Sequence, residues 1–225
     1  GCANPEGEQG LQIGRQIALL SLGIDVPGMT INRYCGSGLE AIAIAAAKIK
    51  AGMGDVYIAG GTESMSMIPM TGYKLAPNYN MASNTPQYLV GMGTTAEAVA
   101  KRYGITREES DKFSLQSHQK AAAAIDAGRF VEQIVPIEVT EVFVRNDQRT
   151  SKSAVVQTDE GLRRDTSMEV LGKLRPVFAN IGIVTAGSSS QTSDGASFVL
   201  VMSEKALKRW DLVPKSRLVS YATAG

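Results

Sequence analysis

Residues 29–61 read MTINRYCGSGLEAIAIAAAKIKAGMGDVYIAGG, and this stretch decides the fold class. The segment 29–35 contains β-prone residues, which favours a strand. Residues 36–50 place apolar side chains at helical spacing, and Gly52 is a suitable residue to end that helix. The apolar run 55–61 then predicts a second strand. A strand, a helix and a strand within about 30 residues form a βαβ unit, which predicts an α/β layered fold.

The rest of the chain alternates helical and strand patterns around a long irregular region at 67–90. Helices are expected at 8–22, 95–103, 107–127, 203–210 and, as a short helix, within 159–178; strands are expected at 134–144, at the end of 182–202 and at 216–224. Thr106 and Glu109 form a T-x-x-E capping box, and residues 146–153 read as a polar turn. The pattern indicates a compact βαβ segment, a long insertion and a return to strands.

The composition is that of an ordinary globular protein and argues against several classes of function. Hydrophobic residues make up 44% and charged residues 20% of the chain. The 23 Lys and Arg residues nearly cancel the 22 Asp and Glu residues, so no charge excess indicates nucleic acid or an anionic membrane as a partner. No apolar run approaches the roughly 18 residues of a membrane span, and the first ten residues do not resemble a signal peptide.

The chain contains two cysteines, Cys2 and Cys35, and one histidine, His118. Two cysteines are too few for a disulfide framework or a Cys-rich zinc site, which favours a reducing compartment. His118 lies in the middle of an expected helix beside Gln and Lys residues. It reads as an exposed structural histidine, and no metal site is expected.

Cys35 stands where the expected strand at 29–35 meets the expected helix at 36–50. Unpaired N–H groups and the helix dipole favour an anion there, so a thiol at this corner is biased toward thiolate. Gly36, Ser37 and Gly38 leave space beside the sulfur, and nearby N–H groups can hold an oxyanion. The alternative is that Cys35 is a small buried packing residue, as free cysteines usually are. Position and composition leave both interpretations open.

Two other nucleophile arrangements fit less well. A serine-hydrolase elbow, G-x-S-x-G, centred on Ser37 would need glycine at the position of Cys35. A Cys–His protease would need His118 as the partner base of the thiol. Neither pattern explains the corner.

Several separate motifs make the chain similar to the thiolases, which form or break carbon–carbon bonds between acyl groups carried on coenzyme A. The segment NRYCGSGLEAI (32–42) is followed about twenty residues later by AGGTESMS (59–66). The likeness continues at 1–10, 91–124, 173–178 and 182–202, and it therefore covers essentially the whole chain. The details resemble most closely the degradative 3-ketoacyl-CoA thiolases of bacterial type.

This resemblance implies a role for particular residues. Cys35 matches the acyl-accepting nucleophile of the family. The residues that match its substrate and coenzyme A contacts are Met92, Arg163, Leu174, Val177, Phe178, Ala186 and Ser190. Gly91 stands where relatives that prefer very short acyl chains often carry histidine, which argues against strict specificity for acetoacetyl-CoA. Coenzyme A and acyl-CoA are implied as substrates, with no permanently bound cofactor and no metal.

Structural explanations remain open for each of these residues. Arg163 and Arg164 also suit a solvated pair of side chains. Leu174, Val177 and Phe178 also suit a hydrophobic core, and Ser190 lies in a Gly/Ser-rich turn that needs no ligand. Glu63 and Ser64 follow a glycine pair at the end of a strand and read as supporting structure.

The resemblance also implies a domain organisation. Residues 1–66 and 183–225 are expected to form the N-terminal thiolase core without its first strand and helix, and 67–182 to form a loop insertion that binds coenzyme A. The family's G-H-P and C-x-G-G-G segments, which belong to a C-terminal domain, do not occur in this sequence. The chain therefore resembles part of the N-terminal half of a thiolase, and alone it is expected to be inactive.

The implied activity is cleavage of a 3-ketoacyl-CoA by coenzyme A, or the reverse Claisen condensation, through an acyl-cysteine. The setting implied is fatty acid β-oxidation in the cytoplasm by a homodimer or homotetramer, without nucleic acid or a membrane span. The alternatives are an acetoacetyl-CoA-type biosynthetic thiolase, a non-catalytic acyl-CoA-binding subunit and a ketoacyl synthase. Ketoacyl synthases lack the long insertion with KLRPVF (173–178), so that alternative fits poorly.

Overall fold

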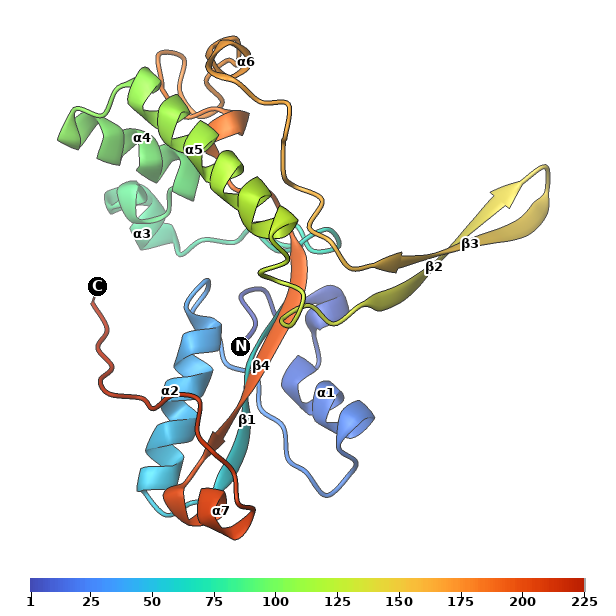
Figure 1. Cartoon of the computed structure of the whole chain (residues 1–225). Helices are drawn as coiled ribbons and strands as arrows, with labels where there is room; N and C mark the ends of the chain where they lie inside the picture. Colours follow the sequence, from blue (N-terminus) through green and yellow to red (C-terminus); the bar gives the residue numbers. More distant parts are fainter. Residues whose placement is uncertain (225) are drawn as a thin grey trace. The chain divides into compact units, whose positions relative to one another are not determined.

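The computed structural model describes residues 1–224, which divide into two compact units. The first unit contains residues 1–77 and the chain from Thr192 onward, and the second contains 78–191. The helices are α1 (Ile13–Ser21), α2 (Ser37–Lys50), α3 (Tyr79–Asn84), α4 (Met92–Tyr103), α5 (Arg107–Asp126), α6 (Met168–Gly172) and α7 (Glu204–Arg209), and the strands are β1 (Val56–Ser64), β2 (Ile137–Arg145), β3 (Gln148–Val156) and β4 (Asp194–Met202) (Figure 1). Short 3-10 helices span Gly7–Gln9, Pro86–Tyr88 and Ala186–Ser188.

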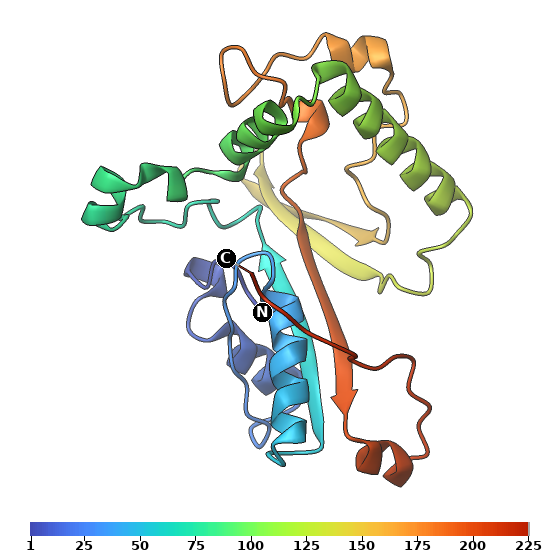
Figure 2. The same cartoon turned by 90° about the vertical axis from the view of Figure 1, so that its left-hand side faces the viewer.

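The core of the first unit lies between helix α2 and a pair of strands. Strands β1 and β4 pair antiparallel, with Gly60 opposite Phe198. Helix α2 runs along this pair, as Figures 1 and 2 both show. Ala41 and Ala45 of the helix and Ala59 of β1 are buried in the contact. Their small side chains let the helix approach the strands closely, since the distance between packed elements depends on the side chains at the contact.

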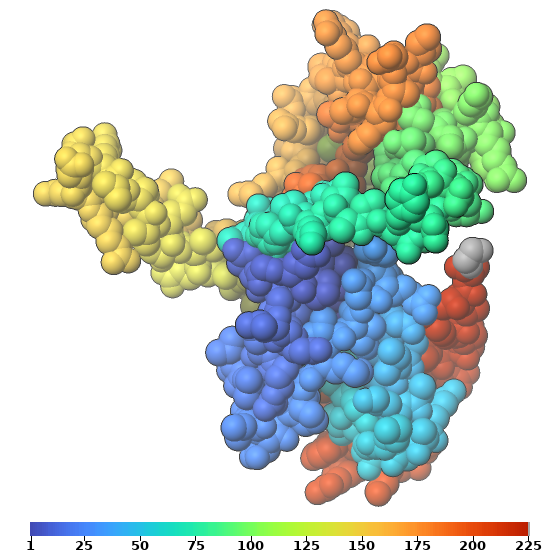
Figure 3. Space-filling model, turned by 180° about the vertical axis from the view of Figure 1, so that it is seen from behind, coloured from blue at the N-terminus to red at the C-terminus, as the bar shows by residue number. Residues whose placement is uncertain are grey.

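Helix α1 and the segment that follows it cross at two glycines. A Cβ atom on Gly14 would lie 2.3 Å from the carbonyl oxygen of Met29, and one on Gly28 would lie 2.3 Å from the carbonyl oxygen of Gly14. Both positions therefore require glycine. The Arg15 guanidinium also donates to the Val26 carbonyl. Figure 3 shows α1 and the following segment side by side in blue.

Two of the expected strands are not strands, and both predictions were wrong. Residues 29–32 belong to no helix or strand. In the described part of the chain a single backbone hydrogen bond links them to another segment, from Cys2 N–H to the Ile31 carbonyl at 2.9 Å. Residues 216–224 have no regular structure either. A strand requires a repeating ladder of backbone hydrogen bonds, which neither segment has. The expected parallel βαβ unit is replaced by α2 packed on the antiparallel β1–β4 pair.

The second unit contains the helical pair that the sequence predicts. Helix α5 begins with the complete capping box, in which Glu109 N–H donates to the Thr106 hydroxyl at 3.2 Å and the Glu109 carboxylate accepts from Thr106 N–H at 2.8 Å. The hydrogen bond from the Thr106 backbone and, to a smaller extent, the one from its side chain lower the pKa of Glu109 below its usual value. Helix α4 ends at Tyr103, and its C-cap residue Gly104 has a φ of 65°. The region 67–90, expected to be irregular, contains the short helix α3, capped by the Asn78 side chain.

Strands β2 and β3 form an antiparallel hairpin in which Arg145 lies opposite Gln148. The two turn residues, Asn146 and Asp147, have φ values of 52° and 58°. Two consecutive positive φ values are typical of a type I′ turn, which asparagine and aspartate tolerate. The expected polar turn at 146–153 is therefore too long, because most of it belongs to β3. The strand is exposed on both faces, so no alternation of apolar and polar residues marks it.

Helix α7 begins at the expected cap, since the Ser203 side chain accepts from Ala206 N–H. Among residues 1–224, no helix combines the length and the apolar character needed to cross a membrane.

Candidate active site

Cys35 is an exposed free cysteine directly before the first turn of helix α2. Gly36 caps the helix and Ser37 begins it. The Ser37 side chain is buried, and its hydroxyl accepts from Arg33 N–H at 2.8 Å and donates to the Tyr34 carbonyl at 2.6 Å. Hydrogen bonds of Ser37 therefore fix the backbone of this corner, while the Cys35 thiol faces solvent.

The amide groups around this corner differ in how they are bonded. Gly36 N–H donates to the Arg33 carbonyl and Ser37 N–H to the Tyr34 carbonyl, each at 3.0 Å. These two amides are therefore occupied and do not act as free oxyanion donors. In residues 1–224, the N–H groups of Gly38 and Leu39 have no hydrogen-bond acceptor. The start of α2 thus keeps the partial positive charge of unpaired first-turn amides beside Cys35.

An anionic side chain in the first turn of α2 is neutralised by its neighbours. The Glu40 carboxylate accepts from Arg33 at 2.7 Å and also from the Tyr221 hydroxyl. That hydrogen bond raises the pKa of Tyr221 above its usual value. The contacts reduce the repulsion that a free carboxylate would exert on an anion at the corner.

Cys2 differs from Cys35 in its exposure to solvent. It is completely buried, and its thiol lies 3.7 Å from the Glu63 carboxylate. Burial raises the pKa of the Cys2 thiol above its usual value, and the Glu63 charge raises it further. A buried neutral thiol is a poor nucleophile.

Limited alkylation is therefore expected to separate the two cysteines. With iodoacetamide at pH 7.5, Cys35 should be modified first, and Cys2 should stay unmodified until the protein is unfolded. Peptide mapping by mass spectrometry at successive times measures both rates in one sample. Equal labelling of the two cysteines in the folded chain would contradict the burial of Cys2.

A cavity of about 810 Å³ lies within the second unit. Its walls are one face of α5, the loop 159–166, residues of 170–174 that include the end of α6, and the turn 186–191. Four of the residues implied to contact coenzyme A line it, namely Arg163, Leu174, Ala186 and Ser190. Pockets of several hundred cubic ångströms suit small-molecule ligands.

His118 also lines this cavity, which the sequence interpretation missed. It is half-buried, and its Nδ1 atom accepts from Arg163 N–H at 3.2 Å. The prediction that His118 is exposed was wrong. The signal was present in its spacing, because Ser114, Ala121 and Ile125 lie on the same side of α5 and line the cavity with it.

The remaining implied contacts lie elsewhere. Val177 and Phe178 line a separate hollow formed by residues 175–180 and are partly exposed. Met92 is the first residue of α4 and is 70% exposed. The Phe178 ring packs so closely on Gly93, the next residue, that a Cβ atom there would lie 2.4 Å from it. The structure therefore does not bring these three residues into the large cavity.

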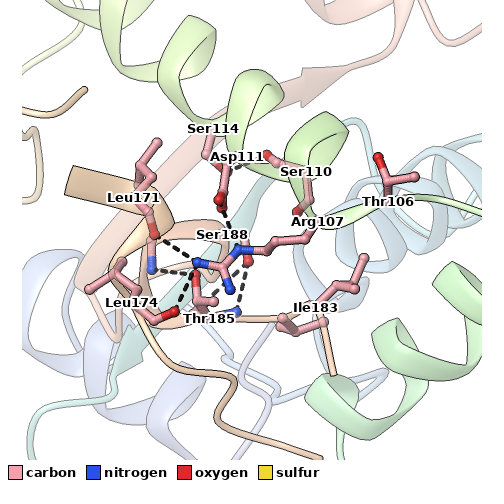
Figure 4. A network of polar contacts seen from close by, with 12 residues as sticks. Thr106, Arg107, Ser110, Asp111, Ser114, Leu171, Leu174, Ile183, Thr185 and Ser188 are labelled. Atoms are coloured by element: carbon pink, nitrogen blue, oxygen red, sulfur yellow. Dashed lines mark hydrogen bonds and ion pairs between the residues drawn. The ribbon is translucent and has the colours of Figure 1, made fainter. Parts of the chain in front are cut away.

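A buried network supports the wall of the cavity (Figure 4). The Arg107 guanidinium lies 2.8 Å from the Asp111 carboxylate and donates to the carbonyls of Leu171 at 2.7 Å and Leu174 at 2.9 Å. Asp111 is 2% exposed, and its second oxygen, Oδ1, is buried without a partner among the described residues. Arg107 thereby holds the end of α6 and the following loop against α5.

Two further observations concern where these residues lie. The catalytic candidate Cys35 belongs to the first unit, whereas every residue that lines the large cavity belongs to the second. Among residues 1–224, no three His, Cys, Asp or Glu side chains are grouped as metal ligands.

Comparison with known proteins places the chain in a family. Residues 1–205 match the family model described as "Thiolase, N-terminal domain". A 3-ketoacyl-CoA thiolase of Bacillus subtilis is 48% identical over the whole chain, and a beta-ketoadipyl-CoA thiolase of Acinetobacter baylyi is 38% identical. The chain covers 58% and 59% of these two relatives, so it spans somewhat more than half of their length.

A solved structure shows the same fold. The crystal structure of the Bacillus anthracis acetyl-CoA acetyltransferase matches 95% of this chain with a TM-score of 0.76 and 36% sequence identity, and 55% of that chain is covered. The expected thiolase-like α/β fold is confirmed by this match and by the family model. The chain therefore belongs to the thiolase family.

Proposed function

We propose that this chain carries the nucleophile and the coenzyme A cavity of an acyltransferase that cleaves 3-ketoacyl-CoA to acetyl-CoA and a shortened acyl-CoA. The observation that carries the proposal is Cys35, an exposed thiol at the start of a helix, directly before the small residues Gly36, Ser37 and Gly38. The relatives named 3-ketoacyl-CoA thiolase, which match along the whole chain, support the same activity.

The proposed reaction has two halves that share one intermediate. The Cys35 thiolate attacks the 3-keto carbonyl, the bond between C2 and C3 breaks, and the acetyl-CoA carbanion that leaves takes up a proton. The acyl group remains on Cys35 as a thioester. The thiolate of a second coenzyme A then attacks this thioester, releases the shortened acyl-CoA and regenerates Cys35. The reverse sequence is the Claisen condensation.

The unpaired amides at the start of α2 give the corner its part in this chemistry. The Gly38 and Leu39 N–H groups have no acceptor among residues 1–224, and unpaired amides at the start of a helix favour an anionic group close to them. The chain needs no metal or permanently bound cofactor for these steps, because coenzyme A and acyl-CoA enter as substrates.

These 225 residues contain no second catalytic group for the proton transfers. The single histidine, His118, accepts a hydrogen bond from Arg163 in the second unit, and Cys2 is buried against Glu63. General acid–base catalysis contributes typically 10²–10⁴-fold to a rate. We therefore expect a polypeptide of these 225 residues to show negligible thiolase turnover.

One experiment tests the proposed function. The chain is incubated with a 3-ketoacyl-CoA, and Cys35 is analysed by peptide mass spectrometry while acetyl-CoA is quantified. We expect a slow acyl adduct on Cys35, with at most one acetyl-CoA released per chain. Binding without an adduct would instead indicate a non-catalytic acyl-CoA-binding subunit, and rapid multiple turnovers would contradict the expected inactivity of this polypeptide.

Coenzyme A is proposed to bind in the cavity of the second unit. Arg163 supplies positive charge for the nucleotide phosphates, and Leu174, Ala186 and Ser190 provide the wall along the pantetheine. Met92, Val177 and Phe178 remain proposed contacts of the substrate, although they lie outside this cavity.

Separate substitutions of the adjacent residues Arg163 and Arg164 are expected to show which guanidinium group contributes to coenzyme A binding. Arg163→Ala should weaken coenzyme A binding by about tenfold or more, because charge-assisted hydrogen bonds to phosphate are lost. Arg164→Ala is the matched control. Its guanidinium pairs with Asp126 at 2.8 Å and 3.0 Å, which lowers the pKa of Asp126. Isothermal titration calorimetry with coenzyme A should show little change for Arg164→Ala, and equal losses for both variants would contradict the assignment.

The finer assignments are proposed from the resemblance to degradative thiolases. Gly91 and the relatives named 3-ketoacyl-CoA thiolase favour degradation of longer acyl chains over biosynthesis from acetyl-CoA. We therefore propose a role in fatty acid β-oxidation in the cytoplasm, within a homodimer or homotetramer.

A further inference from the structure

We infer that Asn32 is a positioning residue for Cys35, because its side chain holds the backbone of the intervening Tyr34 in a strained conformation. The inference rests on the proposed role of Cys35 as nucleophile. It concerns a different residue and a different property, the geometry of the corner.

The strain lies at Tyr34. Its φ of 44° is in the left-handed region, which a residue with a Cβ atom adopts at a cost in free energy. Its side chain is 73% exposed, so packing does not hold it there. A conformation of this kind persists only when surrounding contacts fix it. Since Tyr34 directly precedes Cys35, its backbone angles set the direction in which the thiol leaves the chain.

Both polar groups of the Tyr34 backbone are fixed by hydrogen bonds. Its carbonyl accepts from the N–H of Ser37 at 3.0 Å and from the hydroxyl of the same residue at 2.6 Å. Its N–H donates to Oδ1 of Asn32 at 2.8 Å. An asparagine that accepts from the N–H two residues later forms an Asx turn. Asn32 therefore holds the side of Tyr34 that helix α2 does not reach.

Asn32 is itself anchored to the N-terminal segment. Its Nδ2 atom donates to the Ala3 carbonyl at 2.9 Å. Ala3 N–H donates to the Glu63 carboxylate at 2.7 Å, and the same carboxylate accepts from the buried Gln9 side chain at 2.8 Å. Glu63 belongs to strand β1, so a continuous chain of hydrogen bonds runs from the strand pair to the corner. Glu63 thereby has a supporting structural role, because it links β1 to the segment that anchors Asn32.

The inference predicts a difference between two substitutions of Asn32. Both Asn32→Ala and Asn32→Ser lose the bond to Ala3. Serine retains an oxygen that can accept from the N–H two residues later, whereas alanine does not. The rate constant for alkylation of Cys35 by iodoacetamide should fall about fivefold in Asn32→Ala, which is the effect of one net hydrogen bond on the population of one conformer. Asn32→Ser should stay within about twofold of the unsubstituted chain.

The measurement uses the complete chain, with peptide mapping to assign the label to Cys35. Thermal unfolding of each variant is recorded in parallel, because a merely structural role would lower stability without the recovery of the alkylation rate by serine. Asn78→Ala is the control, since Asn78 also accepts a backbone N–H, from Met81, but belongs to the second unit. It should leave the alkylation of Cys35 unchanged.

Two results would overturn the inference, namely an unchanged rate in Asn32→Ala or equal rates in the alanine and serine variants. Neither depends on acyl-CoA chemistry. If Cys35 is not acylated by a 3-ketoacyl-CoA but the alkylation rates follow the expected order, the proposed function fails and the positioning role of Asn32 stands.

Discussion

Asp111→Ala is expected to lower the free energy of unfolding of the second unit by about 3 kcal/mol, because it leaves a largely buried guanidinium without its counter-charge. The Arg107 side chain is 26% exposed and the Asp111 side chain 3% exposed. Water therefore reaches the cation only partly and cannot replace the carboxylate. The two carbonyl partners of Arg107, on Leu171 and Leu174, would remain but cannot neutralise it.

Asp111→Asn should cost less than the alanine variant. Only one oxygen of Asp111 accepts a hydrogen bond from Arg107, and an amide oxygen can occupy the same position. The other carboxylate oxygen is buried without a partner among residues 1–224, so its replacement by an NH₂ group removes no contact. The loss of charge nevertheless weakens the remaining bond, since hydrogen bonds between charged partners are the stronger ones.

An exposed pair on the same fold provides the matched control. Lys173 and Glu169 are also separated by four residues, with 2.6 Å between nitrogen and oxygen, but their side chains are 71% and 79% exposed. Exposed pairs of this kind contribute about 0.3–0.5 kcal/mol. In urea unfolding experiments, Asp111→Ala should therefore lower the free energy of unfolding several times more than Glu169→Ala does. Equal destabilisation would mean that burial of the Arg107–Asp111 pair does not set its contribution.

The network also connects stability to the proposed ligand site. Arg107 holds the carbonyls of Leu171 and Leu174, and both residues line the cavity. Asp111→Ala is thus expected to weaken coenzyme A binding in addition to lowering stability. Glu169→Ala should leave binding unchanged, because Glu169 does not line the cavity.

Local features of the fold could be predicted from the sequence because they depend on neighbouring residues. The capping box of Thr106 and Glu109 and the end of α4 at Gly104 are set by hydrogen bonds and backbone angles within a few residues. The expected strand at 29–35 failed for the opposite reason. Whether an extended segment becomes a strand depends on a partner from elsewhere in the chain, and β-prone residues do not supply that information.

In the candidate site, too, contacts between distant residues could not be predicted from the sequence. Arg163, Leu174, Ala186 and Ser190 meet around one cavity, a grouping that no spacing in the sequence predicts. His118 was missed because its immediate neighbours, Ser117, Gln119 and Lys120, give it an ordinary helical context. Its contact is with the backbone of Arg163, 45 residues later in the chain. The role of Asn32 could likewise not be inferred, since the left-handed conformation of Tyr34 is not apparent from its residue type.

Cys35→Ser is expected to reduce acylation by a 3-ketoacyl-CoA by at least about a thousandfold, since loss of a nucleophile removes the covalent pathway. A serine hydroxyl is a far weaker acid than a thiol, so the unpaired amides of α2 are not enough to produce an alkoxide at neutral pH. A serine nucleophile requires an adjacent general base. The 225 residues contain one histidine, and its Nδ1 atom is engaged with Arg163 in the second unit.

The variant separates chemistry from binding because every residue that lines the cavity belongs to the second unit. Coenzyme A affinity, measured by calorimetry, should stay within about twofold of the unsubstituted chain, since serine removes no contact that the cavity makes. Acylation is followed by peptide mass spectrometry, which also reports any adduct on Cys2. An acyl-serine formed at a comparable rate would show that an unrecognised base serves the corner. An adduct on Cys2 in both proteins would show that Cys2, and not Cys35, is the nucleophile. The functional interpretation of the exposed thiol at the start of α2 would then be wrong.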